Sequence, residues 1–548
     1  MLKEILQIHP TDNVVVALVD LEGGSRILHG EETIVLAESI AQKHKITVED
    51  VKQGGIIRMY GVVVGEAIRP IPKGHRISLE NTSHRTDAAR VKDIFYDWKA
   101  PNVSSLQSLT FNGYHRKDGR VGTRNFWVVV PLVFCENRNV LKVKEALETK
   151  LGYRKIDREL PDVDALVAAW RSGKSAEDVL SMDLKAIQNS NRPARLFQNI
   201  DGIKFLTHEG GCGGTRQDAE TLCRLIAGYI ANPNVAGATV LSLGCQNAQI
   251  ELLKQSLDRV GVSQKPIYFT EQQAVDSEYA MIADAVKKTF AGCMLANKQE
   301  RRPAPLSHLS LGLECGGSDG FSGISANPAL GYCSDLLVAL GGKSILSEFP
   351  ELNGVEQELM NRCIDRSTAE KFNKLMSTYA LRAEQVGSGF SYNPSPGNIK
   401  DGLITDAIKS AGAARKGGTA PIAAVLDYTE QATSSGLHLL CTPGNDVEST
   451  TGLAGSGANL IVFTTGLGTP TGNPVCPVVK MSSNSRLAQQ QADLIDFDAG
   501  AIITQGTDLA SEGERLLRFL IEIANGKTTK AEDMGQDDFI PWKRGISL

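Results

Sequence analysis

Short apolar runs separated by turns fill the first part of the chain. Strand-forming residues occupy 13–18, 33–36, 55–60 and 62–64. Segments such as Glu22-Gly23-Gly24 lie between them. They predict turns, because glycine readily adopts turn conformations. The pattern predicts a small all-β module over residues 1–92. The polar stretch at 93–110 contains Pro101 and predicts a linker.

The rest of the chain alternates buried-strand patterns with helical patterns. Strands are expected at 127–133, 240–243, 309–313, 344–346, 421–426 and 459–465, and helices at 220–231, 249–259, 356–365 and 512–524. This βαβ rhythm predicts a central α/β domain over 111–302 and a second α/β domain over 303–548. Polar loops after the strands are expected to form an active-site rim at one edge of a sheet.

Composition indicates a multidomain enzyme. The 548 residues suffice for two to four domains, and 42% hydrophobic residues is ordinary for globular proteins. A net charge of −5 gives no general attraction to nucleic acid or to an anionic membrane. The N-terminus lacks a signal-peptide core, and no apolar run is long enough to span a bilayer, so we expect a cytoplasmic protein. The ten cysteines are then expected to be reduced.

The segment Glu314–Pro328 combines a thiol, two carboxylates, hydroxyls and several glycines. It follows the expected strand at 309–313 and precedes a helix-like stretch at 335–340. Small residues let a backbone approach a ligand closely, and an open α/β sheet binds ligands at such strand ends. The segment therefore predicts a functional loop; the alternative is a structural turn.

Four cysteines have a polar, loop-like context. Cys135, Cys212, Cys245 and Cys315 lie at or near the ends of apolar runs, whereas most of the others have apolar neighbours typical of a core. Thiolates are suitable ligands for iron. No CxxC pair occurs, so spacing alone specifies no metal site, and these cysteines can equally be small residues packed under loops.

These residues carry a resemblance to a known family. The motifs are Asp12-Asn13-Val14, Lys43-His44-Lys45, Gly119–Asn125, the Cys212 and Cys245 loops, Glu314–Pro328, Asn393–Asn398 and Gly468-Thr469-Pro470. In this order they resemble the altronate/galactarate dehydratase family over nearly the whole chain. The resemblance implies a multidomain α/β protein: a β-clip (SAF-like) module, a central domain that is the candidate for dimerisation, and a C-terminal Rossmann-like, metal-binding domain.

The resemblance also implies an iron-dependent sugar-acid dehydratase that acts on a small molecule, as a homodimer. Dehydration removes a weakly acidic proton beside a carboxylate and expels the 3-hydroxyl, giving a 2-keto-3-deoxy acid. A metal stabilises both changes. Cys315 and Asp319 are the first candidate ligands and Glu348 a third, with Cys135, Cys212 and Cys245 as candidates to share the metal. Fe²⁺ is expected; Mn²⁺ and an iron–sulfur cluster stay open.

Candidate acid–base and substrate-binding residues follow from their chemistry. His208, in a glycine-rich segment, and His44, in the N-terminal module, are the candidate acid–base groups. Cations and hydrogen-bonding side chains are candidates to bind the carboxylate and hydroxyls of the substrate: Arg124, Lys480, Ser318, Asn327, Asn398 and Thr469. The alternatives are salt bridges, turns and helix caps.

Several positions depart from the family pattern. They are Gln246, Asp401, Leu467, Thr471, the segment Ser78–Asn81, and an apparent insertion at 151–195 with a helical pattern at 175–187. The start of the chain and Glu314–Gly317 resemble the altronate branch more than the galactarate branch. Alternatives are a dehydratase for galactarate or another acid, a lyase that expels a different group, and an inactive sugar-acid-binding homologue. A nicotinamide enzyme is disfavoured, because no G-x-G-x-x-G follows an early strand.

Overall fold

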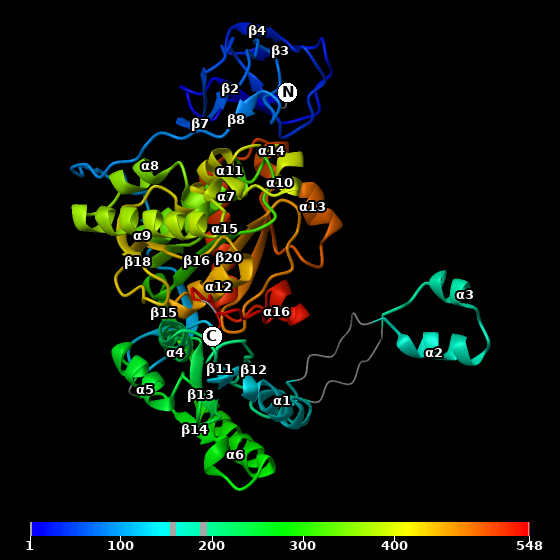
Figure 1. The fold of residues 1–548 in the computed structure, drawn as a ribbon, viewed down its shortest axis with the longest axis vertical. Helices are drawn as coiled ribbons and strands as arrows, with labels where there is room; N and C mark the ends of the chain where they lie inside the picture. Colours follow the sequence, from blue (N-terminus) through cyan, green and yellow to red (C-terminus); the bar gives the residue numbers. More distant parts are fainter. Residues whose placement is uncertain (1–2, 154–160, 187–193, 263, 546, 548) are drawn as a thin grey trace.

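The computed structural model describes residues 3–153, 161–186, 194–262, 264–545 and 547. The chain forms three stacked parts (Figure 1): the N-terminal module at one end, the C-terminal part of the chain in the middle, and the central domain at the other end. This arrangement confirms the predicted multidomain α/β fold with an N-terminal β module.

The N-terminal module is made of short antiparallel strands. They are β1 (Ile5–Leu6), β2 (Val14–Ala17), β3 (Arg26–His29), β4 (Glu32–Val35), β5 (Lys45–Thr47), β6 (Ile56–Met59), β7 (Val62–Ala67) and β8 (Thr82–Ser83). They pair as β1-β2-β5, β3-β4 and β6-β7-β8. Apolar residues on β2 and β4 fill a small separate core, among them Val15 and Ile34. Residues 93–109 of the linker contain no helix or strand, and Thr110 already begins the next strand. The linker lies on the C-terminal domain, where Tyr96 Oη and Trp98 Nε1 both donate hydrogen bonds to Thr419.

The central domain is built on a parallel sheet with the order β12-β11-β13-β14. Its strands are β11 (Phe126–Pro131), β12 (Gly202–Phe205), β13 (Val235–Ser242) and β14 (Ile267–Glu271), and its helices are α1 (Asn137–Leu151), α4 (Arg216–Ala231), α5 (Ile250–Arg259) and α6 (Glu278–Ala296). The insertion carries α2 (Val163–Arg171) and α3 (Ala176–Leu180), which lie apart from the other elements in Figure 1. The helical pattern expected at 175–187 is thus a single short helix, and residue 187 lies outside the described residues.

The C-terminal domain holds a seven-stranded parallel sheet with the order β18-β19-β17-β16-β20-β21-β22. The strands are β16 (Ser310–Cys315), β17 (Lys343–Leu346), β18 (Ile422–Leu426), β19 (Gly436–Leu440), β20 (Leu460–Thr465), β21 (Val478–Ser482) and β22 (Phe497–Asp498). The helices are α7 (Ala326–Ala339), α8 (Glu356–Asn361), α9 (Arg366–Gln385), α10 (Pro396–Lys400), α11 (Asp406–Ala413), α12 (Asp446–Gly455), α13 (Ser485–Gln490), α14 (Ala501–Thr504), α15 (Leu509–Ala524) and α16 (Lys530–Met534). From β16 the chain proceeds to β17 on one side and later to β20 on the other, so the order reverses between β16 and β20.

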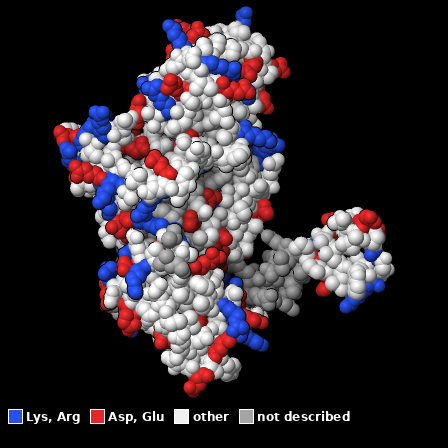
Figure 2. All heavy atoms as spheres, in the orientation of Figure 1, with Lys and Arg blue, Asp and Glu red and all other residues white. Residues whose placement is uncertain are grey.

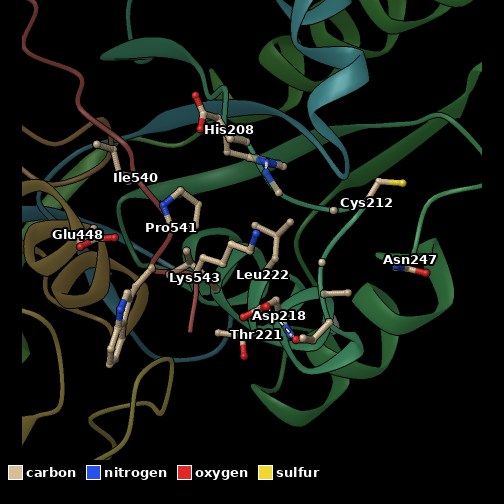
Figure 3. Close-up of a pocket in the computed structure, with 18 of the residues that line it drawn as sticks. His208, Cys212, Asp218, Thr221, Leu222, Asn247, Glu448, Ile540, Pro541 and Lys543 are labelled. Atoms are coloured by element: carbon tan, nitrogen blue, oxygen red, sulfur yellow. Dashed lines mark hydrogen bonds between the residues drawn. The ribbon is translucent and has the colours of Figure 1, made fainter. Parts of the chain in front are cut away.

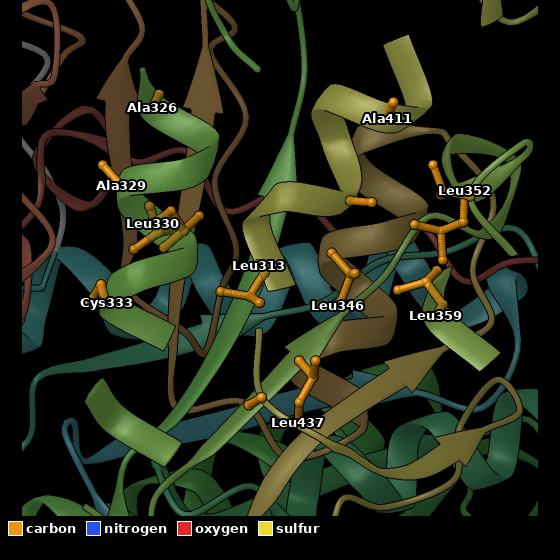
Figure 4. Close-up of a cluster of buried hydrophobic side chains, with 14 of the residues drawn as sticks. Leu313, Ala326, Ala329, Leu330, Cys333, Leu346, Leu352, Leu359, Ala411 and Leu437 are labelled. Atoms are coloured by element: carbon orange, nitrogen blue, oxygen red, sulfur yellow. The ribbon is translucent and has the colours of Figure 1, made fainter. Parts of the chain in front are cut away.

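A continuous apolar core supports this sheet. Leu313 on β16, Leu346 on β17 and Leu437 on β19 pack with Leu330 on α7 and Leu359 on α8 (Figure 4). Helix α7 begins at Ala326, earlier than the stretch at 335–340 predicted from the sequence. The end of the glycine-rich segment is therefore helical, which shortens the loop to the residues directly after β16.

The central and C-terminal domains are firmly joined. Strand β9 (Thr110–His115) pairs with β10 (Val121–Gly122) and with β15 (Arg301–Pro305), so a small antiparallel sheet marks both domain boundaries. Helices α4 and α12 approach each other closely at Gly228 and Gly455. A side chain on Gly228 would overlap the Gly455 carbonyl, so glycine permits this contact. One hydrophobic core cluster contains residues of both domains, including Tyr229 and Phe463.

No helix among the described residues is both long and apolar enough to cross a bilayer. Acidic and basic side chains are interspersed over the face shown in Figure 2. On that face, no large patch of one sign stands out as an attraction for a polyanion.

Candidate functional site

Acidic side chains and a thiol gather at the carboxyl ends of the central strands of the seven-stranded sheet. Glu314 and Cys315 end β16, Glu348 follows β17, and Asp446 begins α12 after β19. Glu351 lies in the 3₁₀ turn Phe349–Leu352. This is the position beside the reversal of strand order where open α/β sheets bind ligands.

Two lysines complete what we call the acid–thiol cluster: Glu314, Cys315, Glu348, Glu351, Asp446, Lys409 and Lys416. The Nζ atom of Lys416 lies 2.7 Å from both Cys315 Sγ and Glu348 Oε2. The Cys315 thiol lies 3.2 Å from Glu351 Oε2, and Lys409 Nζ lies 2.7 Å from Glu351 Oε1. Cys315, Glu348 and Lys416 are each at most 2% exposed. The charges therefore interact strongly, because little water screens them.

Glu314 and Asp446 form the second half of the cluster with Glu348. Ser449 Oγ donates to Glu314 Oε2 over 2.6 Å, and Ser347 Oγ donates to the same atom over 2.9 Å. The Oε1 atoms of Glu314 and Glu348 are buried and accept no hydrogen bond from any described residue. Such acceptors are costly to bury without a partner.

The pKa values show that the negative charge of the cluster is incompletely balanced. Burial raises the pKa of Glu314 well above its usual range, and Glu348 adds to the rise. Burial, Glu348 and Glu351 together raise the pKa of Asp446 to about 7. Burial opposes the charge on Lys416, but the surrounding thiol and carboxylates outweigh it and raise its pKa. The lysine thus keeps its proton.

Backbone strain occurs at the same place. Glu348 has φ 68°, a left-handed conformation that non-glycine residues rarely adopt. Such a residue costs about 1–3 kcal/mol, and this type of strain clusters at functional sites. The Glu348 N–H donates to Thr442 Oγ1 over 2.8 Å, which holds the strained residue in place.

The N-terminal module docks beside this cluster. Lys43, also left-handed with φ 74°, places Nζ 3.0 Å from Asp319 Oδ2 and 2.8 Å from Asp401 Oδ2. Lys45 Nζ donates to the Gly402 carbonyl over 2.6 Å. A side chain on Gly320 would overlap Lys43, so glycine is required for the close approach. The module therefore covers the loop that follows Cys315.

The cluster suits a divalent cation. Cys315, Glu348 and Glu351 have ligand atoms within 4.8 Å of one another, as do Glu314, Glu348 and Asp446. The unpartnered oxygens of Glu314 and Glu348 would be satisfied by a cation. A thiolate among carboxylates favours a transition metal over magnesium or calcium.

Comparisons with known proteins match this chain over all three parts. Family models match at residues 3–85 (altronate/galactarate dehydratase SAF domain), 113–297 (D-galactarate dehydratase/altronate hydrolase, second domain) and 306–547 (D-galactarate/altronate dehydratase, C-terminal). The chain belongs to the altronate/galactarate dehydratase family.

Relatives align over nearly the full length. The altronate dehydratases of Bacillus subtilis (strain 168) and Escherichia coli (strain K12) are each 31% identical over 548 residues, covering all of both chains. The galactarate dehydratase (L-threo-forming) of Escherichia coli (strain K12) is 31% identical over 535 residues, which is 96% of this chain and 94% of the relative. These relatives are sugar-acid dehydratases, so at the level of the family the chain is a hydro-lyase.

The family motif residues around the glycine-rich loop mainly shape it. Asp319 is fully buried but pairs with Lys43, and it belongs to neither ligand group described above. Asn398 lies in the first turn of α10, where it accepts from the Ser395 N–H over 3.0 Å and donates to the Ser318 carbonyl over 2.8 Å. Asn327 donates to the Gly412 carbonyl and accepts from Thr464 Oγ1, so both ends of its amide are used.

Thr469 comes close to the glycine-rich loop from the other side. A Cβ on Gly317 would meet Thr469 Oγ1 and Thr465 Oγ1. Thr469 is half-buried and Ser318 is buried. The structure thus brings Ser318, Asn398 and Thr469 together at the loop, and Ser318 and Thr469 remain candidates to bind substrate hydroxyls.

The two predicted substrate-binding cations have structural partners. Arg124 is buried, and all five of its N–H donors are used within the protein, by Glu532 and by the carbonyls of Thr123, Ile523 and Lys527. Lys480 is fully buried on β21, contacts the Thr471 carbonyl, and lies over the Phe463 ring. Burial lowers the pKa of Lys480 to about 7. Arg124 thus has no N–H donor left for a substrate. Lys480 interacts electrostatically with Asp446 and Glu314 of the acid–thiol cluster, so its role in substrate binding stays a prediction.

The two predicted acid–base histidines lie in different parts of the protein, His208 in the central domain and His44 in the N-terminal module. His208 is buried in the central domain; its Nε2 lies 2.8 Å from the Pro131 carbonyl, and its Nδ1 accepts from the Gly210 N–H. Burial lowers the pKa of His208 to about 4. With both nitrogens engaged, this ring positions its loop. His44 is half-buried at the junction of the module with the C-terminal domain, and burial with Lys45 lowers its pKa.

The other predicted cysteine ligands lie on the central domain. Cys135, Cys212 and Cys245 are exposed, whereas Cys315 is buried in the C-terminal domain. Among the described residues, the ligand group that contains Cys315 includes Glu348 and Glu351 and none of these three cysteines. All ten cysteines are free.

Sequence reasoning missed several members of the cluster: Glu314 as a ligand, Glu351, Asp446, Lys409 and Lys416. One signal was present. Lys409 and Lys416 are seven residues apart, the spacing that places two residues on one face of a helix. The departures Gln246 and Asp401 also have partners: Gln246 braces its own loop through Gly244 and Ala248, and Asp401 binds Lys43.

Proposed function

We propose that this protein dehydrates a sugar acid at the acid–thiol cluster, and that D-altronate is its substrate, giving 2-keto-3-deoxy-D-gluconate. Two relatives that match over the full length are named altronate dehydratases. A galactarate dehydratase is equally identical, so galactarate is the second candidate.

The observation that carries the proposal is the unbalanced charge of the cluster. Four carboxylates face two lysines in a buried site. When all are ionised, two negative charges remain, and burial makes them costly. A divalent cation would balance that charge, and it would also attract the carboxylate of a sugar acid to a site that otherwise repels anions.

We propose ferrous iron as this cation, held by Cys315, Glu348 and Glu351. The thiolate favours iron, while carboxylates alone would suit Mn²⁺ as well. When bound, the ion polarises the substrate carboxylate and a hydroxyl, and so stabilises the enediolate and the departing oxygen.

The chain's own residues supply the proton transfers. Lys416 Nζ, kept protonated by its anionic neighbours, is placed to donate to the departing hydroxyl. Asp446, with its pKa raised to about 7, is suited to take the carbon-bound proton near neutral pH. Lys43 holds the module over the loop, which keeps water from the site.

The test is turnover by protein purified without oxygen, with and without ferrous iron, on a panel that includes D-altronate and galactarate. Formation of a 2-keto acid from altronate supports the proposal, and Cys315→Ser and Glu348→Gln should each abolish it. Cys363→Ser is the matched control, since this buried thiol donates to the Leu359 carbonyl and lies outside the acid–thiol cluster. Turnover of another acid alone would change the substrate. Iron binding with no turnover on any acid would favour a binding protein.

The cellular setting completes the proposal. We propose a cytoplasmic homodimer, as expected from the resemblance. Light scattering of the purified protein measures the mass of the particle, and a monomer would contradict this part alone.

A further inference from the structure

Three exposed cysteines lie at one edge of the central sheet. Cys135 follows β11, Cys212 follows β12 and Cys245 follows β13. Strand β11 lies between the other two, and all three strands are parallel. The carboxyl ends of neighbouring parallel strands meet at the same edge, so these thiols come from three adjacent loops.

The three loops are hydrogen-bonded to one another. The Phe134 N–H donates to the Gly210 carbonyl over 3.0 Å, and the Ala248 N–H donates to the Gly211 carbonyl over 3.1 Å. Gly211 has φ 97°, and a Cβ there would overlap the Leu132 carbonyl. Only glycine permits this approach, so Gly211 allows the Cys212 loop to pack closely against the Cys135 loop.

Polar side chains fix the loops that carry the thiols. His208 links the end of β11 to Gly210 through its two ring nitrogens. Gln246 accepts from the Gly244 N–H over 2.7 Å and donates to the Ala248 carbonyl over 3.1 Å. Both ends of the Gln246 amide are therefore used within its own loop. Gln273 Nε2 donates to Cys245 Sγ over 3.3 Å.

The spacing of the thiols distinguishes between kinds of metal centre. Among the described residues, the groups whose ligand atoms lie within 4.8 Å of one another do not include these cysteines, so they do not form a compact site for one ion. In a [4Fe–4S] cluster each thiolate binds a different iron atom, so the sulfurs stand farther apart than the ligands of a single ion. We propose that Cys135, Cys212 and Cys245 hold a [4Fe–4S] cluster in which one iron has no protein thiolate.

A cavity beside these loops gives such a cluster access to a small molecule. It has a volume of about 580 Å³ and is lined by Cys212, His208 and Asn247, together with Glu448 and Lys543 from the C-terminal part of the chain (Figure 3). This volume is in the range of small-molecule sites. The cluster would border this cavity, apart from the acid–thiol cluster in the other domain.

The experiment measures the cluster directly. Protein purified without oxygen is reconstituted with ferrous iron and sulfide, desalted, and assayed for iron, acid-labile sulfide, visible absorption and the electron paramagnetic resonance signal after reduction. Wild type should hold labile sulfide with a cluster signal. Cys135→Ser, Cys212→Ser and Cys245→Ser should each lose most of both, although the serine variants keep their fold by circular dichroism.

Two controls separate this proposal from the proposed function. Cys363→Ser should keep the cluster, since its buried thiol belongs to neither centre. Cys315→Ser should also keep the cluster while losing turnover. Iron without labile sulfide, or full cluster content in all three serine variants, would overturn the proposal. Loss of the signal in Cys315→Ser with retention in Cys212→Ser would place the cluster in the C-terminal domain and overturn it too.

Discussion

The contact between Lys43 and the glycine-rich loop predicts how the N-terminal module is held. Lys43 is 14% exposed at its side chain, and its partners Asp319 and Asp401 are 0% and 25% exposed. Replacing it with Met keeps most of the apolar volume but removes the charge. Asp319 keeps hydrogen bonds from Ser322, Ser483 and the backbone, so its carboxylate stays partly compensated. We therefore expect Lys43→Met to cost about 1–3 kcal/mol, below the usual cost of breaking a fully buried pair.

The assay is urea unfolding combined with a double-mutant cycle. Lys43→Met, Asp401→Asn and the double variant should give a coupling free energy of about 1–2 kcal/mol, because the pair is half-shielded from water. The matched control in the same module is Lys73 with Glu32, whose side chains are 35% and 70% exposed. That pair should couple by less than about 0.5 kcal/mol. Equal coupling in the two cycles would refute the reasoning that burial makes the Lys43 contact the stronger one.

Four further predictions follow from individual residues. Burial raises the pKa of Asp406 to about 7, so the native state prefers the protonated form of this carboxyl. The contribution of Asp406 to the free energy of unfolding is therefore full below its unfolded pKa and is lost as the pH rises to about 7. Asp406→Asn should therefore flatten the fall in unfolding free energy between about pH 4 and pH 7 by about 3 kcal/mol, and an unchanged slope would contradict the assignment. A Cβ at Gly316 would overlap the Asp446 carboxylate and the Phe463 ring, so Gly316→Ala should lower kcat/KM at least about tenfold, whereas Gly389→Ala, with open space, should not. Arg124→Met should lower the free energy of unfolding by about 3–5 kcal/mol and leave KM unchanged in the folded protein; a raised KM at full stability would restore its substrate-binding role. Ferrous iron at about a hundredfold its dissociation constant should stabilise wild type by about 2.7 kcal/mol in thermal unfolding, and Glu348→Gln should lose most of that gain while Glu358→Gln, on the exposed side of α8, keeps it.

The regular elements could be predicted because each is encoded locally. The apolar run at 459–465 becomes β20, and the periodic stretch at 512–524 lies within α15. Strand order could not be predicted in the same way, since it depends on pairings between distant segments. The β16–β20 pairing, for example, joins Leu311 to Leu460, which are separated in the sequence by a large part of the C-terminal domain.

Cys315 and Glu348 could be chosen as candidate ligands from the sequence because each stands just after an expected strand. Glu351 and Asp446 were missed because ordinary surface carboxylates have the same local sequence, and only the fold buries them. Asp319 was a candidate ligand because it lies in the same glycine-rich segment as Cys315. The tight turn directs its carboxylate to Ser322 and Lys43 instead, a consequence of backbone geometry that the spacing does not reveal.

The same buried charge connects the stability of the protein with its activity. Glu314, Glu348 and Asp446 have raised pKa values because their burial is incompletely compensated, and Glu348 is held in a strained conformation as well. These costs persist only because the surrounding sheet and helices are stable enough to hold the residues there. A bound cation would remove much of the electrostatic cost and create the centre that activates an acidic substrate. The arrangement that destabilises the empty fold is therefore the one that would give the cation its affinity.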